Sequence, residues 1–513
     1  MPNIHENQGF RKPRKSAFDL SHEKKLSFNM GELVPILLEE IVPGDEFKVE
    51  TETLMRLAPM LAPVMHRVNV YCHYFFVPNR ITWNQWEDFI TGGREGTTSP
   101  NFPTVEYGDL WEEYGNSMTG SLADYLGIPS PSGAMNSGGK EISKLPFMAY
   151  NQIYNDFYRD PNLQEEIVVN DSYGMQKRCW EKDYFTSCLP WPQRGPQVDI
   201  PVNTVFEPQY ADKSILLTES GASLPSNAAL TSYDPGAPQL GSDIKNGGAT
   251  ADSLRVENLE PSFELDGTSV TINELRQSNK LQQWLEKQAR GGYRYIETIL
   301  SHFGVKSSDA RLQRAEYLGG GRQPIVISEV LNTTGTTEAA QGTMAGHGIS
   351  VGTTNKFKKR FEEHGYVMGI MSVLPRTGYQ QGIARHWQRT DKTEYYWPEF
   401  ATLGEQEVKD SELYFNATDP QPTEEGTFGY QQRYAEYKYG VSSVHGRFRD
   451  NLDYWHMGRK FDSAPALNTA FVNADPTDRI FAVTDPDEHH LWVQVYNKVL
   501  ARRPMPFFSN PSL

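Results

Sequence analysis

Clusters of lysine and arginine are the residues of this sequence whose types and spacing best suit a chemical task. They fall in three short segments, at residues 11–15, 356–360 and 501–508, and the last two also contain phenylalanine. The cations are Arg11, Lys12, Arg14, Lys15, Lys356, Lys358, Lys359, Arg360, Arg502 and Arg503. Lysine and arginine bind phosphates while neighbouring rings stack on bases, so this combination suits single-stranded nucleic acid. A solvated flexible tail, a solvated face or a contact with a neighbouring subunit would also account for these segments.

The overall charge restricts how such a contact is made. The chain of 513 residues carries a formal net charge of −16, so its surface as a whole repels nucleic acid. The stretch 201–270 contains ten acidic and only three basic residues, and it lacks hydrophobic periodicity. We therefore expect local basic patches to bind nucleic acid and the acidic stretch to project away from the core.

No motif for catalysis, metal binding or cofactor binding is found. The glycines of residues 342–352 are spaced wrongly for a dinucleotide-binding loop, and His489-His490 has no cysteine or carboxylate at ligand spacing. Cys72, Cys179 and Cys188 form neither a disulfide framework nor a zinc motif, which is typical of a reducing compartment. We predict no catalytic residue, no metal site and no cofactor. No apolar run approaches the length of a membrane span, so we also predict no membrane insertion.

Short strands separated by long irregular stretches indicate a mainly β fold. Alternating or continuous apolar residues predict strands at 68–77, 325–330, 366–374 and 491–499. This spacing favours a sandwich or barrel with elaborate loops over a regular alternation of strands and helices.

A few helices interrupt the strands. Thr82 and Gln85 fit a capping box that opens a helix ending before Gly92. A second capping box begins at Thr271, ahead of an apolar stripe that ends at Gly291-Gly292, and another short helix follows over residues 295–303. Their tryptophan and tyrosine residues suit a hydrophobic core better than a cofactor site.

Longer stretches spread along the whole chain carry a further signal, among them Tyr74-Phe-Phe-Val-Pro-Asn-Arg80 and Gly429-Tyr-Gln-Gln-Arg-Tyr-Ala-Glu-Tyr-Lys-Tyr439. The others are residues 16–21, 60–67, 83–93, 292–297, 303–305, 309–320, 364–369, 375–377 and 446–449. In this order they resemble the major capsid protein of the Microviridae, small single-stranded-DNA bacteriophages, and most closely that of the gokushovirus branch.

The resemblance implies an eight-stranded antiparallel jelly roll with large loop insertions and a few short helices. We expect a basic N-terminal arm over residues 1–30 and a capsid domain over residues 31–513. Residues 201–270 fit, by position and acidity, an insertion that forms protrusions at the threefold axes for host attachment. The family carries no catalytic residue across to this chain.

The resemblance also implies partners. The chain would assemble with its own copies, through pentamers, into a small T=1 icosahedral shell around circular single-stranded DNA. Other partners would be a small basic DNA-binding protein, an internal scaffolding protein, a pilot protein and a host surface receptor. The protein would reside in the virion capsid after assembly in the bacterial host cytoplasm. Because the chain is acidic, the small basic protein would help to neutralise the genome.

A different class of function is consistent with the composition. Tryptophan- and tyrosine-rich β folds with long loops also occur among enzymes that act on carbohydrates. Such an enzyme needs two carboxylates held together in an aromatic cleft, an arrangement that only the folded structure reveals.

Overall fold

The computed structural model describes most of the chain. The described residues are 14–94, 97–115, 117–130, 139–195, 217–219, 254–256, 272–291, 295–304, 306, 308–333, 343–415, 426–485 and 488–508. The chain divides into two units, one made of residues 1–196 with 283–513 and the other of residues 197–282. The main sheets and the sites considered below belong to the first unit.

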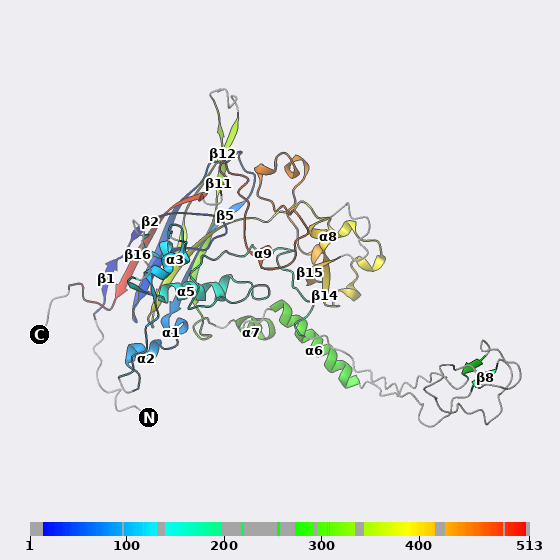
Figure 1. Ribbon diagram of the computed structural model, residues 1–513, viewed down its shortest axis with the longest axis horizontal. Helices are drawn as coiled ribbons and strands as arrows, with labels where there is room; N and C mark the ends of the chain where they lie inside the picture. The colour runs from blue at the N-terminus through cyan, green and yellow to red at the C-terminus, as the bar shows by residue number, and fades with distance from the viewer. Residues whose placement is uncertain are drawn as a thin grey trace, which may run out of the picture. The chain divides into compact units, whose positions relative to one another are not determined.

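Two antiparallel sheets form the body of the first unit (Figure 1). The first sheet has the order β1-β16-β4-β12-β11, and β2 also pairs with β16. Its strands are β1 (Ser16–Asp19), β2 (His22–Phe28), β4 (Glu46–Leu57), β11 (Val326–Leu331), β12 (Met344–Arg360) and β16 (Leu491–Arg503). The second sheet has the order β10-β5-β13-β3. Its strands are β3 (Val34–Ile41), β5 (Val68–Pro78), β10 (Glu316–Pro324) and β13 (Gly365–Pro375).

The order in which the chain visits the two sheets is that of a jelly roll. Apart from β1 and the edge strand β11, each sheet holds four strands. These eight strands alternate between the sheets along the chain, except that β5 is followed by β10 in the same sheet. The mainly β, jelly-roll fold with large insertions is therefore confirmed.

The hydrophobic core lies between the two sheets. Along β4, Phe47, Val49 and Met55 are buried while Lys48 and Leu54 face outward, because successive side chains of a strand point to opposite faces. Both faces of the second sheet are covered. Phe75, for example, packs against the cluster of α5 (Leu145–Ile153). The outer face of the first sheet thus remains the more exposed one.

A buried polar link joins the sheets across this core. The hydroxyl of Tyr74 on β5 donates to Thr51 Oγ1, which in turn donates to Asn497 Oδ1 at 3.0 Å. Asn497 Nδ2 then donates to the carbonyl oxygen of Ile36 at 2.9 Å. Since buried polar groups are costly unless they are paired, this chain fixes how the two sheets stack.

Two long insertions depart from the jelly roll. The first contains α1 (Asn79–Thr82), α2 (Trp86–Thr91), β6 (Thr104–Glu106), α3 (Tyr107–Glu113), α4 (Leu122–Leu126), β7 (Glu141–Ser143), α5, the π-helix η2 (Tyr154–Tyr158), β8 (Leu217–Glu219), β9 (Leu254–Val256), α6 (Ile272–Gly291) and α7 (Tyr295–Phe303). The second contains η4 (Arg385–Trp387), η5 (Lys392–Glu394), η6 (Pro398–Phe400), β14 (Glu405–Lys409), α8 (Asp410–Leu413), β15 (Thr427–Gln432), η7 (Ala435–Tyr437), η8 (Gly446–Arg449), η9 (Asp453–Trp455) and α9 (Thr469–Val472). A helix long and apolar enough to cross a membrane is absent from the described residues.

The helix predictions are only partly correct. The capping box at Thr82 is wrong, because Thr82 lies in α1 and its hydroxyl donates to the carbonyl oxygen of Asn79. Helix α2 instead begins at Trp86, and it ends as predicted at Gly92, whose φ of 78° is left-handed. Helices α6 and α7 occur as predicted, while Thr271 lies outside the described residues.

The structure describes part of each of the two segments expected to lie outside the capsid core. Within the expected arm of residues 1–30, residues 1–13 lie outside the described residues, while β1 and β2 join the first sheet. The expected insertion of residues 201–270 also lies outside the described residues, except for β8 and β9, which pair with each other.

Candidate nucleic-acid interface

A group of exposed basic residues lies at one end of the outer face of the first sheet. Strand register brings them together, because β16 and β12 pair with β4 on its two sides. Cα pairing places Arg502 and Arg360 on either side of Glu46. Two residues further along the strands, Lys358 lies opposite Lys48. The arrangement forms rows of charge across three strands.

The next row repeats the pattern of the first. Lys498 of β16 and Lys356 of β12 lie on either side of Glu50 of β4. Six exposed cations therefore share this end of the sheet with three carboxylates, the partly exposed Glu46 and Glu50 and the exposed Asp19 of β1. We call these cations the basic face; they are Lys48, Lys356, Lys358, Arg360, Lys498 and Arg502.

Most of the charge of the basic face is available to a ligand. Lys358 Nζ lies 3.0 Å from Glu46 Oε1, and the hydrogen bond from Lys358 lowers the pKa of Glu46 below its usual value. Among the described residues, Lys48, Lys356 and Arg502 have no carboxylate within ion-pair distance. An excess of positive charge therefore remains exposed on this face despite the acidic total of the chain.

Some of the predicted DNA-binding cations have structural partners instead. Lys359 pairs with Glu316, and burial lowers its pKa. Arg503 donates to Asp45 Oδ2 at 3.0 and 3.1 Å and to the carbonyl oxygen of Glu40. These contacts hold β12 and β16 in place, so these two cations are poorly placed to bind phosphates.

Of the two N-terminal cations that the structure describes, one has a structural partner and the other is exposed. Lys15 donates to the carbonyl oxygen of Gly44, whereas the side chain of Arg14 is exposed. Arg11 and Lys12 lie outside the described residues. Arg14 lies two residues before Ser16, which pairs with Arg503 at the end of β16. The arm therefore enters the sheet at the same end as the basic face.

Aromatic rings lie at this end as well. Phe18 of β1 stacks on Phe507 with ring centroids 5.9 Å apart, and Phe508 contacts Phe507. Phe507 and Phe508 are 63% and 73% exposed. Exposed rings beside lysine and arginine suit the binding of single strands, whose bases are free to stack.

The sequence alone did not reveal two members of the basic face. Lys48 and Lys498 are single cations within alternating strands, so neither stands out as a cluster. Strand alternation predicts that each points outward, but only the register places Lys48 opposite Lys358 and Lys498 across Glu50 from Lys356. Among the described residues, no three histidine, cysteine or carboxylate side chains are grouped to hold a metal ion.

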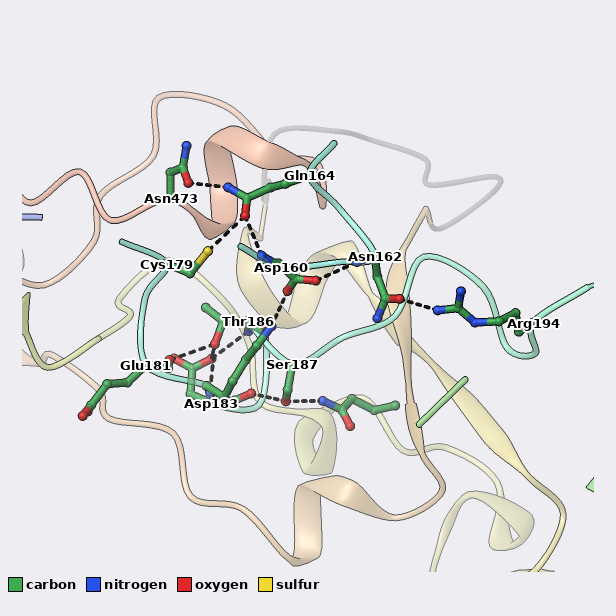
Figure 2. Close-up of polar contacts among 12 residues, drawn as sticks. Asp160, Asn162, Gln164, Cys179, Glu181, Asp183, Thr186, Ser187, Arg194 and Asn473 are labelled. Carbon is green, nitrogen blue, oxygen red and sulfur yellow. Dashed lines mark hydrogen bonds and ion pairs between the residues drawn. The ribbon is translucent and has the colours of Figure 1, made fainter. Parts of the chain in front are cut away.

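A cleft of about 980 Å³ lies elsewhere in the first unit, over the outer side of β5. Its lining includes aromatic rings and carboxylates, the combination that a carbohydrate-active enzyme requires; the carboxylates are Asp160, Glu181, Glu297 and Asp309. Asp160 pairs with Lys182 and accepts from the backbone of Asn162, within a polar network shown in Figure 2. Glu181 forms an ion pair with Arg376, in which Arg376 Nη1 lies 2.9 Å from Glu181 Oε2.

The charge state of Glu181 does not suit a general acid. Burial alone would raise its pKa, but hydrogen bonds from Tyr71 and Arg376 hold the pKa of Glu181 below its usual value. A glycosidase acid instead needs a raised pKa to keep its proton. Glu181 is therefore not suited to the general-acid role that the enzymatic alternative requires.

Comparison with known proteins gives matches over nearly the whole chain. The family model described as capsid protein (F protein) matches residues 8–513. The capsid protein VP1 of Chlamydia phage 1 is 34% identical, covering 100% of this chain and 98% of the relative. VP1 of Bdellovibrio phage phiMH2K is 35% identical, over 100% and 96%, and VP1 of Spiroplasma virus 4 is 30% identical, over 97% and 95%. These matches confirm the resemblance to the Microviridae and their gokushovirus branch, and the chain belongs to the capsid protein (F protein) family.

Proposed function

We propose that this capsid protein forms a small T=1 icosahedral shell around circular single-stranded DNA, with the basic face turned toward the genome. The observation that carries the proposal is the set of exposed cations in register across β16, β4 and β12. Family membership supports a structural role in the virion and assembly with further copies. No catalytic step is part of the proposal.

The exposed outer face of the first sheet supports this orientation. A flat surface with regularly spaced cations meets a flexible phosphate backbone without demanding a base sequence. Each neutralised phosphate of a single strand contributes only about 0.7 to the slope of log K against log salt. Repetition over every copy in a closed shell makes the summed attraction large, because the copies act multivalently.

Arg14, together with Arg11 and Lys12, would add to this attraction. We propose that the basic arm preceding β1 extends from the same end of the sheet and reaches the DNA or a neighbouring subunit. The acidic total of −16 leaves part of the genome charge unbalanced. A small basic DNA-binding protein would supply the remaining cations, while an internal scaffolding protein and a pilot protein would assist assembly through pentamers in the host cytoplasm.

Residues 201–270 have a separate role in the proposal. Their acidity and weak hydrophobicity suit a projecting surface loop, and acidic protrusions stay clear of the genome. We propose that these residues form protrusions at the threefold axes that contact a host surface receptor.

Electron microscopy of purified protein mixed with circular single-stranded DNA tests the proposed function. We expect closed isometric particles in which the DNA resists added nuclease. Empty or open assemblies whose DNA is fully digested would contradict enclosure of the genome. A stable monomer that forms no particles under any of these conditions would contradict the shell itself.

A further inference from the structure

We infer that the hairpin of β11 and β12 is an assembly arm that binds a second copy of this chain. The inference rests on the self-assembly of the proposed function and names the surface that performs it. The hairpin consists of the described residues 326–333 and 343–351, at the end of the first sheet opposite the basic face. In Figure 1 it extends beyond the neighbouring strands.

The hairpin exposes apolar side chains on both of its faces. Val326 and Val330 point to one side of β11 and are 62% and 51% exposed, while Leu331 points to the other side and is 52% exposed. Met344 and Val351 on β12 are also exposed. These apolar side chains remain in contact with water on both faces of the ribbon, so a partner that covers them gains free energy from their burial.

Strand β11 also has an unpaired edge. It is the last strand of the first sheet, and β12 is its only neighbour among the described strands. Residues 344–348 of β12 extend past the pairing with β4, which begins at Ile349. An edge strand with exposed apolar residues is a surface on which another chain readily adds.

The hairpin is anchored at Gly346, which lies opposite Glu329 of β11. Gly346 N donates to the carbonyl oxygen of Met60 at 3.1 Å, and Met60 N donates to the carbonyl oxygen of Gly346 at 3.3 Å. A Cβ atom at Gly346 would lie 2.2 Å from the carbonyl oxygen of Ala62, so only glycine permits this approach. The hairpin is therefore preorganised, which lowers the conformational entropy that it loses when a partner binds.

Charge identifies a second copy as the partner. In the described part of the hairpin, Glu329 is the only carboxylate, and neither lysine nor arginine occurs. Copies that each carry −16 repel one another, so they approach most easily where charge is sparse. Nucleic acid would require cations at this surface, and the hairpin supplies none.

The test replaces exposed apolar side chains without disturbing strand preference. The triple variant Val326→Thr, Val330→Thr and Leu331→Thr keeps residues suited to a strand and alters no buried position. We expect the protein concentration needed for shell formation to rise by roughly tenfold or more, with an unchanged circular dichroism spectrum and melting temperature. The control variant Val168→Thr and Leu403→Thr, at side chains 64% and 62% exposed elsewhere, should assemble as the parent protein does.

Assembly of the triple variant at the parent's concentration would overturn the inference. If the triple variant fails to fold, hydrogen exchange of the parent protein decides instead. Amides of residues 326–331 should exchange more slowly in shells than in free subunits, and equal exchange would overturn the inference. Either negative result leaves the proposed function standing as long as the parent protein still encloses DNA. A parent protein that forms no shells would instead overturn the proposed function.

Discussion

Replacing three cations of the basic face should weaken DNA binding and make its affinity less dependent on salt concentration. The variant is Lys48→Gln, Lys356→Gln and Arg502→Gln, one from each of β4, β12 and β16. All three side chains are exposed and none has a carboxylate within ion-pair distance among the described residues. Folding should therefore be unaffected, because surface substitutions of this kind usually change stability by less than about 0.5 kcal/mol.

The size of the effect follows from the number of phosphates released. Each lost phosphate contact on a single strand lowers the slope of log K against log salt by about 0.7, so three contacts lower it by about 2. Between about 50 mM and about 200 mM salt, the affinity of the variant should thus fall roughly 20-fold less than that of the parent. The difference between the two proteins is largest at low salt, where electrostatic attraction dominates.

Fluorescence anisotropy with a labelled oligonucleotide measures these affinities over a series of salt concentrations. A control with the same change in net charge is Lys140→Gln, Lys392→Gln and Arg447→Gln, three exposed cations outside the first sheet. The slope of log K against log salt for the control should differ from that of the parent by no more than about 0.7, the contribution of one phosphate contact. Equal slopes for the basic-face variant and the control would refute the reasoning, since only total charge would then matter.

Three further predictions concern stability and attachment. Burial lowers the pKa of His73 from 6.5 to about 4, so between these pH values the unfolded state binds a proton that the folded state does not. The contribution of His73 to the free energy of unfolding should therefore be complete above pH 6.5 and fall by about 3 kcal/mol toward pH 4. Urea titrations should show this loss in the parent protein and not in His73→Gln. Phe47→Ala, at a fully buried core position, should cost about 3–5 kcal/mol in the same titrations, against less than about 0.5 kcal/mol for the exposed control Leu403→Ala. Deleting residues 201–270 should leave particles visible by electron microscopy but abolish adsorption to host cells; a deletion protein that is insoluble would argue against a projecting loop.

Local pattern predicts four strands of the two main sheets, β5, β11, β13 and β16, but not the other six, of which β4 and β10 show the reasons. In β4, the buried positions include Thr51 and Thr53, which interrupt the apolar alternation because they serve the polar links of the core. Strand β10 contains Gly319, Gly320 and Gly321 and so resembles a loop. A Cβ at Gly320 would lie 2.5 Å from the carbonyl oxygen of Cys72, so close strand packing is the reason for glycine there.

The basic face illustrates a second limit of sequence reasoning. Clustered charge predicts the segments around Lys356 and Arg502 as candidate DNA contacts. It does not predict Lys48, because a single lysine carries no signal until β4 is placed between β12 and β16. Conversely, Lys359 and Arg503 belong to the same clusters, yet their carboxylate partners, distant in sequence, give them structural roles. Pairing between segments hundreds of residues apart decides which cations are free.

The position of β16 has a consequence for how the chain folds during synthesis. Strand β16 lies between β4 on one side and β1 and β2 on the other, so the first sheet depends on pairing between residues 16–57 and 491–503. Contacts so distant in sequence form slowly and only after the whole intervening chain exists. The first sheet therefore stays incomplete until residue 503 has left the ribosome. A nascent chain interrupted earlier lacks β16, an interior strand that pairs on both of its edges, so neither β1 and β2 nor β4 has its partner in the first sheet.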